Sequence, residues 1–162
     1  MEIERKWLIN INDIPYDLSK YEHFDIEQAY ISFKPTIRIR KIINTNEYIL
    51  TTKSSSNDNG LSRQEYEINI SQDEYDKLLN KIDGIVLKKT RYKIKENDLI
   101  MEIDIFHDEY EGLAYMEIEF NSVQEAKAYK QPSFVMKELT YDCKFSNASL
   151  AKRNIDIEDI YN

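Results

Sequence analysis

The chain of 162 residues is long enough to bury a hydrophobic core of its own, and we expect one domain over residues 1–162. Its composition, 41% hydrophobic and 32% charged, is typical of soluble globular proteins, and no stretch approaches the roughly 20 apolar residues that span a bilayer. The net charge of −8 excludes the broad basic surface that non-specific nucleic-acid binding requires.

The cysteine, histidine and glycine content excludes further classes of protein and of binding site. The single cysteine, Cys143, excludes an internal disulfide framework and suits a reducing compartment. Glu2 and Glu4 stand where the apolar part of a signal peptide would develop, so we expect no leader and a cytoplasmic location. With only His23 and His107 besides Cys143, a Cys/His zinc site has too few ligands. Three glycines provide neither a P-loop nor a dinucleotide fingerprint, so any phosphate must be bound by side chains.

Short segments in which apolar and polar residues alternate predict eight β-strands. They cover residues 1–9, 26–33, 36–43, 47–54, 61–70, 85–96, 98–106 and 112–120. Turn-forming residues separate several of them, for example at 34–35 and 44–46. Because most connections are too short for a parallel crossover, we expect antiparallel hairpins and meanders.

Three helices are expected among and after these strands. Capping-box sequences open a helix over about 71–82 and another over about 122–130. A third, short helix is expected over residues 148–153. Residues 54–60, rich in serine and asparagine, are typical of a hairpin loop rather than of a domain linker.

Charged residues of one sign occupy alternate positions in several of the predicted strands. The acidic pairs are Glu2/Glu4, Glu65/Glu67, Glu102/Asp104 and Glu117/Glu119. The basic pairs are Arg38/Arg40 and Lys89/Arg91, and Lys6 extends the first acidic pair. Because strand side chains alternate between faces, each pair points from one face. A solvated face usually mixes signs, whereas these pairs place like charges ~7 Å apart, which favours a binding surface.

Such a surface can hold a metal-chelated polyphosphate. Carboxylates are the ligands that Mg²⁺ and Mn²⁺ prefer, and arginine and lysine neutralise phosphate oxygens. If the sheet closes on itself, the charged residues line its interior and the apolar residues pack outward against the helices. We therefore expect an α+β fold, mainly antiparallel β, in the form of a closed eight-stranded β-barrel with a few flanking helices. A barrel of this size has room inside for one small ligand.

The order of these residues resembles the triphosphate tunnel metalloenzyme family, also called the CYTH superfamily, across nearly the whole chain. The hallmark E-x-E-x-K of its first strand is matched by Glu2, Glu4 and Lys6. The other matching segments are Arg38-Ile39-Arg40, Lys53, Glu65-Tyr66-Glu67, Lys89-Thr90-Arg91, Glu102-Ile103-Asp104, Glu117-Ile118-Glu119, Lys137-Glu138-Leu139-Thr140 and Asn147-Ala148-Ser149-Leu150-Ala151. Many bacterial members carry Arg-Tyr where this chain has Lys144-Phe145, which keeps the charge but loses bidentate phosphate binding.

The resemblance implies a role for each charged group. The main metal site would consist of Glu2, Glu4, Glu117 and Glu119, with Glu102 and Asp104 as the next candidates. The triphosphate would be bound by Lys6, Arg38, Arg40, Lys53, Lys89, Arg91 and Lys137. The catalytic candidates are Glu4, Lys6 and Glu119, and further site candidates are Glu65, Glu67 and Lys144. The implied cofactor is Mg²⁺ or Mn²⁺, as one or two ions.

The same resemblance leaves three functions open. Water attack on the terminal phosphorus gives a triphosphatase, for which we expect inorganic tripolyphosphate as the substrate, with nucleoside or thiamine triphosphate as alternatives. Attack by a ribose 3′-hydroxyl on the α-phosphorus gives a class IV adenylate cyclase, which forms cyclic AMP and pyrophosphate. A polyphosphate- or nucleotide-binding module without turnover is the third. The expected partner is a small triphosphate, with no membrane and no non-specific nucleic-acid binding, and a homodimer is compatible with the sequence.

Overall fold

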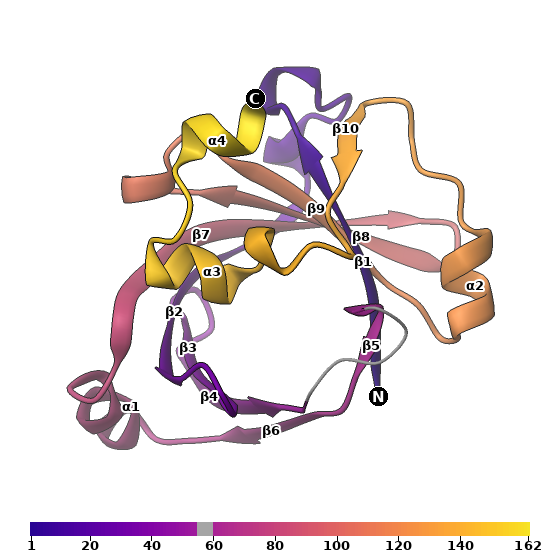
Figure 1. The fold of residues 1–162 in the computed structure, drawn as a ribbon. Coiled ribbons are helices and arrows are strands. Elements are labelled where there is room, and N and C mark those ends of the chain that lie inside the picture. The colour runs from indigo at the N-terminus through magenta and orange to yellow at the C-terminus, as the bar shows by residue number, and fades with distance from the viewer. Residues whose placement is uncertain (55–59) are drawn as a thin grey trace.

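An antiparallel β-barrel with a few short helices is the architecture of the computed structural model, which describes residues 1–54 and 60–162 (Figure 1). Its strands are β1 (Glu2–Ile9), β2 (Glu22–Ser32), β3 (Thr36–Ile42), β4 (Glu47–Lys53), β5 (Ser62–Arg63), β6 (Glu65–Asn69), β7 (Asp83–Glu96), β8 (Leu99–Phe106), β9 (Ala114–Glu119) and β10 (Val135–Glu138). The predicted hairpin loop over 54–60 lies, for residues 55–59, outside the described residues.

The α-helices of the described residues are short, and three of the four begin at side-chain caps. They are α1 (Gln72–Leu79), α2 (Val123–Ala128), α3 (Asn147–Lys152) and α4 (Ile157–Tyr161), with 3₁₀ turns η1 (Ile11–Asp13), η2 (Leu18–Lys20), η4 (Asp108–Tyr110) and η5 (Cys143–Phe145). Ser71 and Glu74 form the predicted reciprocal capping box of α1, and Ser122 accepts from the backbone of Glu125 to start α2. Helix α4 was not predicted from the sequence. Among the described residues no helix is long and apolar enough to cross a bilayer.

The strands follow the order β10-β1-β9-β8-β7-β2-β3-β4-β6, each antiparallel to its neighbours. The short strand β5 pairs with β1 at Glu2 and Ile3. Because only Gln64 separates β5 from β6, this pairing brings the two ends of the sheet together and nearly closes the ring, as Figure 1 shows. The same edge of β1 continues at Trp7–Ile9, where it pairs with β10.

The predicted antiparallel β-barrel is confirmed, nearly closed and with three differences in its strands. The predicted strand over 61–70 is interrupted at Gln64 and forms β5 and β6, which together make one stave of the ring. Of the ten strands described, β10 lies outside the ring, and β5 and β6 share one position. The remaining strands and this shared position give eight positions around the barrel. The strand β10 was missed because its four residues are too few for a clear alternating pattern. Strand β2 begins at Glu22, earlier than predicted.

The inward-facing positions change from charged to apolar along the barrel. On β1, Glu2, Glu4 and Lys6 line a cavity, whereas Leu8, next on the same face, is fully buried in a hydrophobic cluster. That cluster also contains inward-facing residues of other strands and residues of α3 and α4. Its members include Tyr115 of β9, Phe106 of β8, Leu87 of β7, Leu150 and Ala151 of α3, and Ile160 of α4. One end of the interior is therefore filled by apolar packing, and the charged groups gather at the other.

Candidate active site in the barrel cavity

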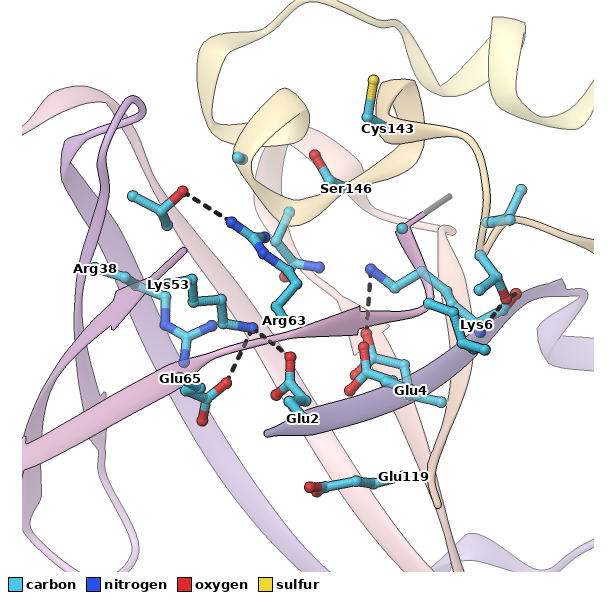
Figure 2. A pocket seen from close by; sticks show the side chains of 18 of the residues that line it. Glu2, Glu4, Lys6, Arg38, Lys53, Arg63, Glu65, Glu119, Cys143 and Ser146 are labelled. Atoms are coloured by element: carbon cyan, nitrogen blue, oxygen red, sulfur yellow. Dashed lines mark hydrogen bonds and ion pairs between the residues drawn. The ribbon is translucent and has the colours of Figure 1, made fainter. Parts of the chain in front are cut away.

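The barrel interior holds a cavity of about 610 Å³ with a predominantly charged lining. It brings together residues that are far apart in the sequence but share the inward face of their strands. The predicted site residues that line it are Glu2, Glu4, Lys6, Arg38, Arg40, Lys53, Glu65, Glu67, Lys89, Arg91, Glu102, Glu117 and Glu119. Figure 2 shows several of these side chains converging from β1, β3, β4, β6 and β9, with Cys143 and Ser146 near α3 on the opposite wall.

Three carboxylates near the start of β1 are short of positive charge. Glu4 lies directly opposite Glu119 of β9, and Glu2 lies on the same face of β1 as Glu4. Burial and the charges of Glu117 and Glu2 raise the pKa of Glu4 well above its usual value. Burial also raises the pKa of Glu2, where Glu65 adds to the effect and Lys53 opposes it, and it raises the pKa of Glu119 together with Glu2 and Glu65. The negative charge of this group is therefore only partly neutralised by the protein.

A second acidic group is already neutralised. Arg91 contacts Glu102 and Glu117 at 3.1 Å each and holds Asp104 through two hydrogen bonds of 2.7 and 2.8 Å. Burial alone would raise the pKa of Glu117, but Lys6 and Arg91 lower it to about 2. The positive charges of Arg91 and Lys89 likewise outweigh the burial of Asp104 and hold its pKa far below its usual value. These carboxylates hold the side chains of Lys6, Lys89 and Arg91 in defined directions.

The cations of the cavity differ in how fully they are neutralised. Lys6 lies 3.4 Å from Glu117, and Lys89 lies 2.8 Å from Asp104. Burial, opposed by Asp104, lowers the pKa of Lys89 to about 8. Arg40 instead donates two hydrogen bonds to the neutral amide of Gln28, and burial together with Arg38 and Arg91 lowers its pKa to about 10. The Arg40 guanidinium therefore keeps its full charge for an anion.

Arg38 also has capacity for an anion. Its Nη2 atom lies 3.3 Å from the hydroxyl oxygen of Thr51 and 3.8 Å from a carboxylate oxygen of Glu67. Its buried Nε atom has no hydrogen-bond partner among the described residues. A buried donor without a partner is costly, so a bound anion that accepts from it is favoured.

Three predicted site residues do not line the cavity. Asp104 is fully buried behind it, and its two carboxylate oxygens accept from Lys89 and Arg91. Lys137 is exposed on β10, where its ammonium nitrogen lies 4.7 Å from the centre of the Phe145 ring. Lys144 is exposed and lies 3.8 Å from Asp142.

Three residues of the site were missed in the sequence, and a fourth, Asn147, was named there only as part of a matching segment. Arg63 of β5 and Tyr30 of β2 line the cavity, and Asn147 lies at its wall as the first residue of α3. Gln28 lies behind Arg40 and is fully buried. Alternation alone could have indicated Arg63, because it precedes Glu65 and Glu67 on the same face. The other three needed the strand register or the position of α3, which no local pattern contains.

The carboxylate group at the start of β1 fits a divalent metal ion by its chemistry. Glu2, Glu4 and Glu119 offer only oxygen donors, which suit Mg²⁺ or Mn²⁺, and their surplus negative charge favours a bound cation. Over residues 1–54 and 60–162, no three acidic, histidine or cysteine side chains already stand in a coordinating arrangement. The cavity therefore offers oxygen donors of the right chemistry, without a preformed coordinating arrangement among the described residues.

Comparison with known proteins places this architecture in one family. The family model for the CYTH domain matches residues 1–142. Two relatives named inorganic triphosphatase are 34% identical (Nitrosomonas europaea) and 32% identical (Acetivibrio thermocellus), and each alignment covers 93% of this chain and 96% and 93% of the relative, respectively. A crystal structure described as an inorganic triphosphatase superposes with a TM-score of 0.66 at 30% identity, covering 94% of this chain and 95% of that one. The chain belongs to the CYTH family.

Proposed function

We propose that this protein hydrolyses inorganic tripolyphosphate with the aid of a divalent metal ion bound in the barrel cavity. The observation that carries the proposal is the division of one cavity between under-neutralised carboxylates and arginines that keep their charge. Both relatives named inorganic triphosphatase align over 93% of this chain, which supports the same substrate class. The cavity of about 610 Å³ gives a compact triphosphate room on the cationic wall.

Cationic side chains of the cavity would bind the phosphate oxygens of the substrate and so orient it. Arg40 offers a guanidinium group whose partner is the neutral Gln28, and Arg38 offers one whose carboxylate neighbour, Glu67, lies 3.8 Å away. Arg63 offers a third, which donates to Thr36 of β3. Lys6 and Lys89 add ammonium groups whose positions are set by Glu117 and Asp104. Phosphoryl transfer is accelerated mainly by positioning and charge stabilisation, which this wall provides. Attack of water on the terminal phosphorus breaks the phosphoanhydride bond and yields orthophosphate and pyrophosphate.

Glu2, Glu4 and Glu119 would hold Mg²⁺ or Mn²⁺, with Glu117 and Glu102 close by on β9 and β8. When bound, such an ion supplies positive charge that neutralises triphosphate oxygens. Lys53, which bridges Glu2 and Glu65, would then be free to contact the substrate. A cytoplasmic location and the lack of non-specific nucleic-acid binding stay predictions of the sequence, and a homodimer stays compatible with it.

The test is a panel of triphosphates with and without metal. Purified protein is incubated with tripolyphosphate, ATP or thiamine triphosphate in the presence of Mg²⁺, Mn²⁺ or EDTA. Released orthophosphate, pyrophosphate and cyclic AMP are each measured. The proposal expects metal-dependent release of orthophosphate and pyrophosphate in equal amounts from tripolyphosphate, and slower turnover of the other two substrates.

Two other outcomes would replace the proposal with one of the alternatives. Cyclic AMP and pyrophosphate from ATP would make the protein an adenylate cyclase. Tight binding of tripolyphosphate without any product, under every metal condition, would make it a binding module. Calorimetric titration of tripolyphosphate against the protein separates this second outcome from an inactive preparation.

A further inference from the structure

Gln28 connects the phosphate-binding wall to the helix that borders it. Its side-chain oxygen accepts from Nε and Nη2 of Arg40 at 3.1 and 2.9 Å, and its nitrogen donates to the side-chain oxygen of Asn147 at 2.8 Å. The residue is fully buried, and Arg40 lies directly opposite it on β3. Because both ends of the amide are engaged, turning it over would break three hydrogen bonds at once.

The neutrality of this partner sets Arg40 apart from the lysines around it. Lys6, Lys53 and Lys89 each lie within 3.4 Å of a carboxylate. Arg40 has an equally well-defined direction, but the oxygen that holds it carries no charge. An amide can therefore orient the guanidinium without cancelling the charge that a phosphate would meet.

Asn147 ties this arrangement to α3. Its side-chain oxygen accepts from Lys89 at 3.0 Å as well as from Gln28, so one oxygen joins two members of the wall. The position of α3 is itself closely set by β7. A Cβ atom on Gly84, whose φ is +78°, would lie 2.3 Å from the carbonyl oxygen of Ala151, so only glycine permits this approach. The place of Asn147 is therefore fixed by backbone packing, and Gln28 transmits it to Arg40.

We propose that Gln28 is a positioning residue, which aims Arg40 into the cavity through a neutral hydrogen-bonded link to Asn147 and so sets the affinity for polyphosphate. The inference rests on the proposed function for its substrate. It goes beyond that function in assigning the aim of Arg40 to a buried amide that lies outside the cavity lining. Gln28 acts through Arg40, so its effect must disappear when Arg40 is absent.

The test is a double-mutant cycle of Gln28→Met and Arg40→Ala, read out by KM, kcat and the calorimetric Kd for tripolyphosphate. Methionine matches the length of glutamine but makes none of these three hydrogen bonds. We expect Gln28→Met to raise KM and Kd about tenfold with a smaller change in kcat. In the Arg40→Ala background the same substitution should change neither KM nor Kd. Equal effects of Gln28→Met in both backgrounds would overturn the proposal, because Gln28 would then act on stability or packing alone.

Gln28→Glu tests whether the neutrality of the partner matters. The glutamate still accepts from Arg40 but cannot donate to Asn147, so the melting temperature should fall, and its charge should weaken tripolyphosphate binding about tenfold. Unchanged affinity in this variant would show that the neutrality of Gln28 is irrelevant and would contradict the proposal. Asn147→Ala provides a second route if Gln28→Met does not fold. Because Asn147 also accepts from Lys89, only part of its loss should disappear when Arg40 is absent, and a loss that is the same in both backgrounds would contradict the proposal.

These outcomes are distinct from those that test the proposed function. Absence of turnover of every triphosphate by the unmodified protein would remove the hydrolase, but the Kd values of the cycle would still report on Gln28. Metal-dependent turnover with additive effects in the cycle would keep the hydrolase and remove the positioning role.

Discussion

The ammonium nitrogen of Lys53 lies 2.9 Å from a carboxylate oxygen of Glu2, although the two residues are 51 positions apart. The same nitrogen lies 3.2 Å from Glu65 of β6, so one cation joins β1, β4 and β6 (Figure 2). These contacts lie where β5 and β1 nearly close the ring through a short pairing. Lys53 therefore helps to hold the proposed metal ligands of β1 against the rest of the barrel.

Lys53→Met should lower the free energy of unfolding by about 2 kcal/mol at pH 7, because two largely buried carboxylates lose their shared cation. Mg²⁺ should restore part of this loss by supplying positive charge to the same carboxylates. Scanning calorimetry with and without MgCl₂ measures both effects. The matched control is Lys95→Met, at an exposed position of β7, for which a change of no more than about 0.5 kcal/mol is expected. Identical melting temperatures for Lys53→Met and the unmodified protein would contradict this role.

Glu4→Gln should reduce metal-dependent turnover by at least about 100-fold while the protein stays folded, since the variant loses a proposed metal ligand but also a repulsive charge. Steady-state kinetics over a Mg²⁺ titration and the circular-dichroism melting curve measure the two properties. Glu22→Gln, at an exposed position of β2, is the control and should retain full activity. Undiminished turnover of the Glu4→Gln variant would refute its role as a ligand.

Arg63→Ala should raise the KM for tripolyphosphate about tenfold, with a smaller effect on kcat. Arg63 lines the cavity, and its guanidinium donates to the carbonyl oxygen of Ser54 and to the hydroxyl of Thr36, which are neutral acceptors. Arg63→Lys keeps the charge but not the planar fork and should give an intermediate KM. Initial-rate kinetics on the three proteins measure this order. A KM for Arg63→Ala equal to that of the unmodified protein would remove Arg63 from the site.

The ion pair between Arg5 and Glu138 predicts a pH-dependent contribution to stability outside the cavity. Burial alone would raise the pKa of Glu138, but hydrogen bonds from Arg5 and Thr140 outweigh it and hold the pKa below the usual value of 4.5. A lowered folded-state pKa means that the unfolded chain binds more protons in acid, so the contribution is complete above pH 4.5 and is lost as pH falls below it.

Comparison of the unmodified protein with Glu138→Gln measures this contribution. We expect a difference of about 1 kcal/mol at pH 7 that shrinks as the pH falls from 5 toward the lowered pKa of Glu138. Denaturant unfolding of both proteins across this pH range provides the measurement. A difference that stays constant with pH would show that the pair stabilises only through the shape of its contacts.

Much of the barrel could be predicted because the alternation of apolar and polar residues that indicates a strand is a local feature of the sequence. Alternation in β1, β3 and β8 identified these strands nearly to their ends and showed which side chains share a face. The same rule placed Glu2, Glu4 and Lys6 on one face, where the structure finds them around the cavity. These predictions hold in the structure because a shift of one residue in register would turn all the apolar side chains of a strand toward solvent.

What the amino-acid sequence alone determined was therefore the faces of the strands and the charges that they carry. Only the tertiary structure decided which charges meet, because register depends on irregularities such as the shift between Tyr30 and Ser32 in the β2–β3 pairing. Packing of α3 decided that Asn147 reaches Gln28, 119 residues away, and closure of the ring decided that Lys53 meets Glu2, 51 residues away. Alternation is a property of neighbouring residues, whereas these contacts arise only when distant segments are packed together.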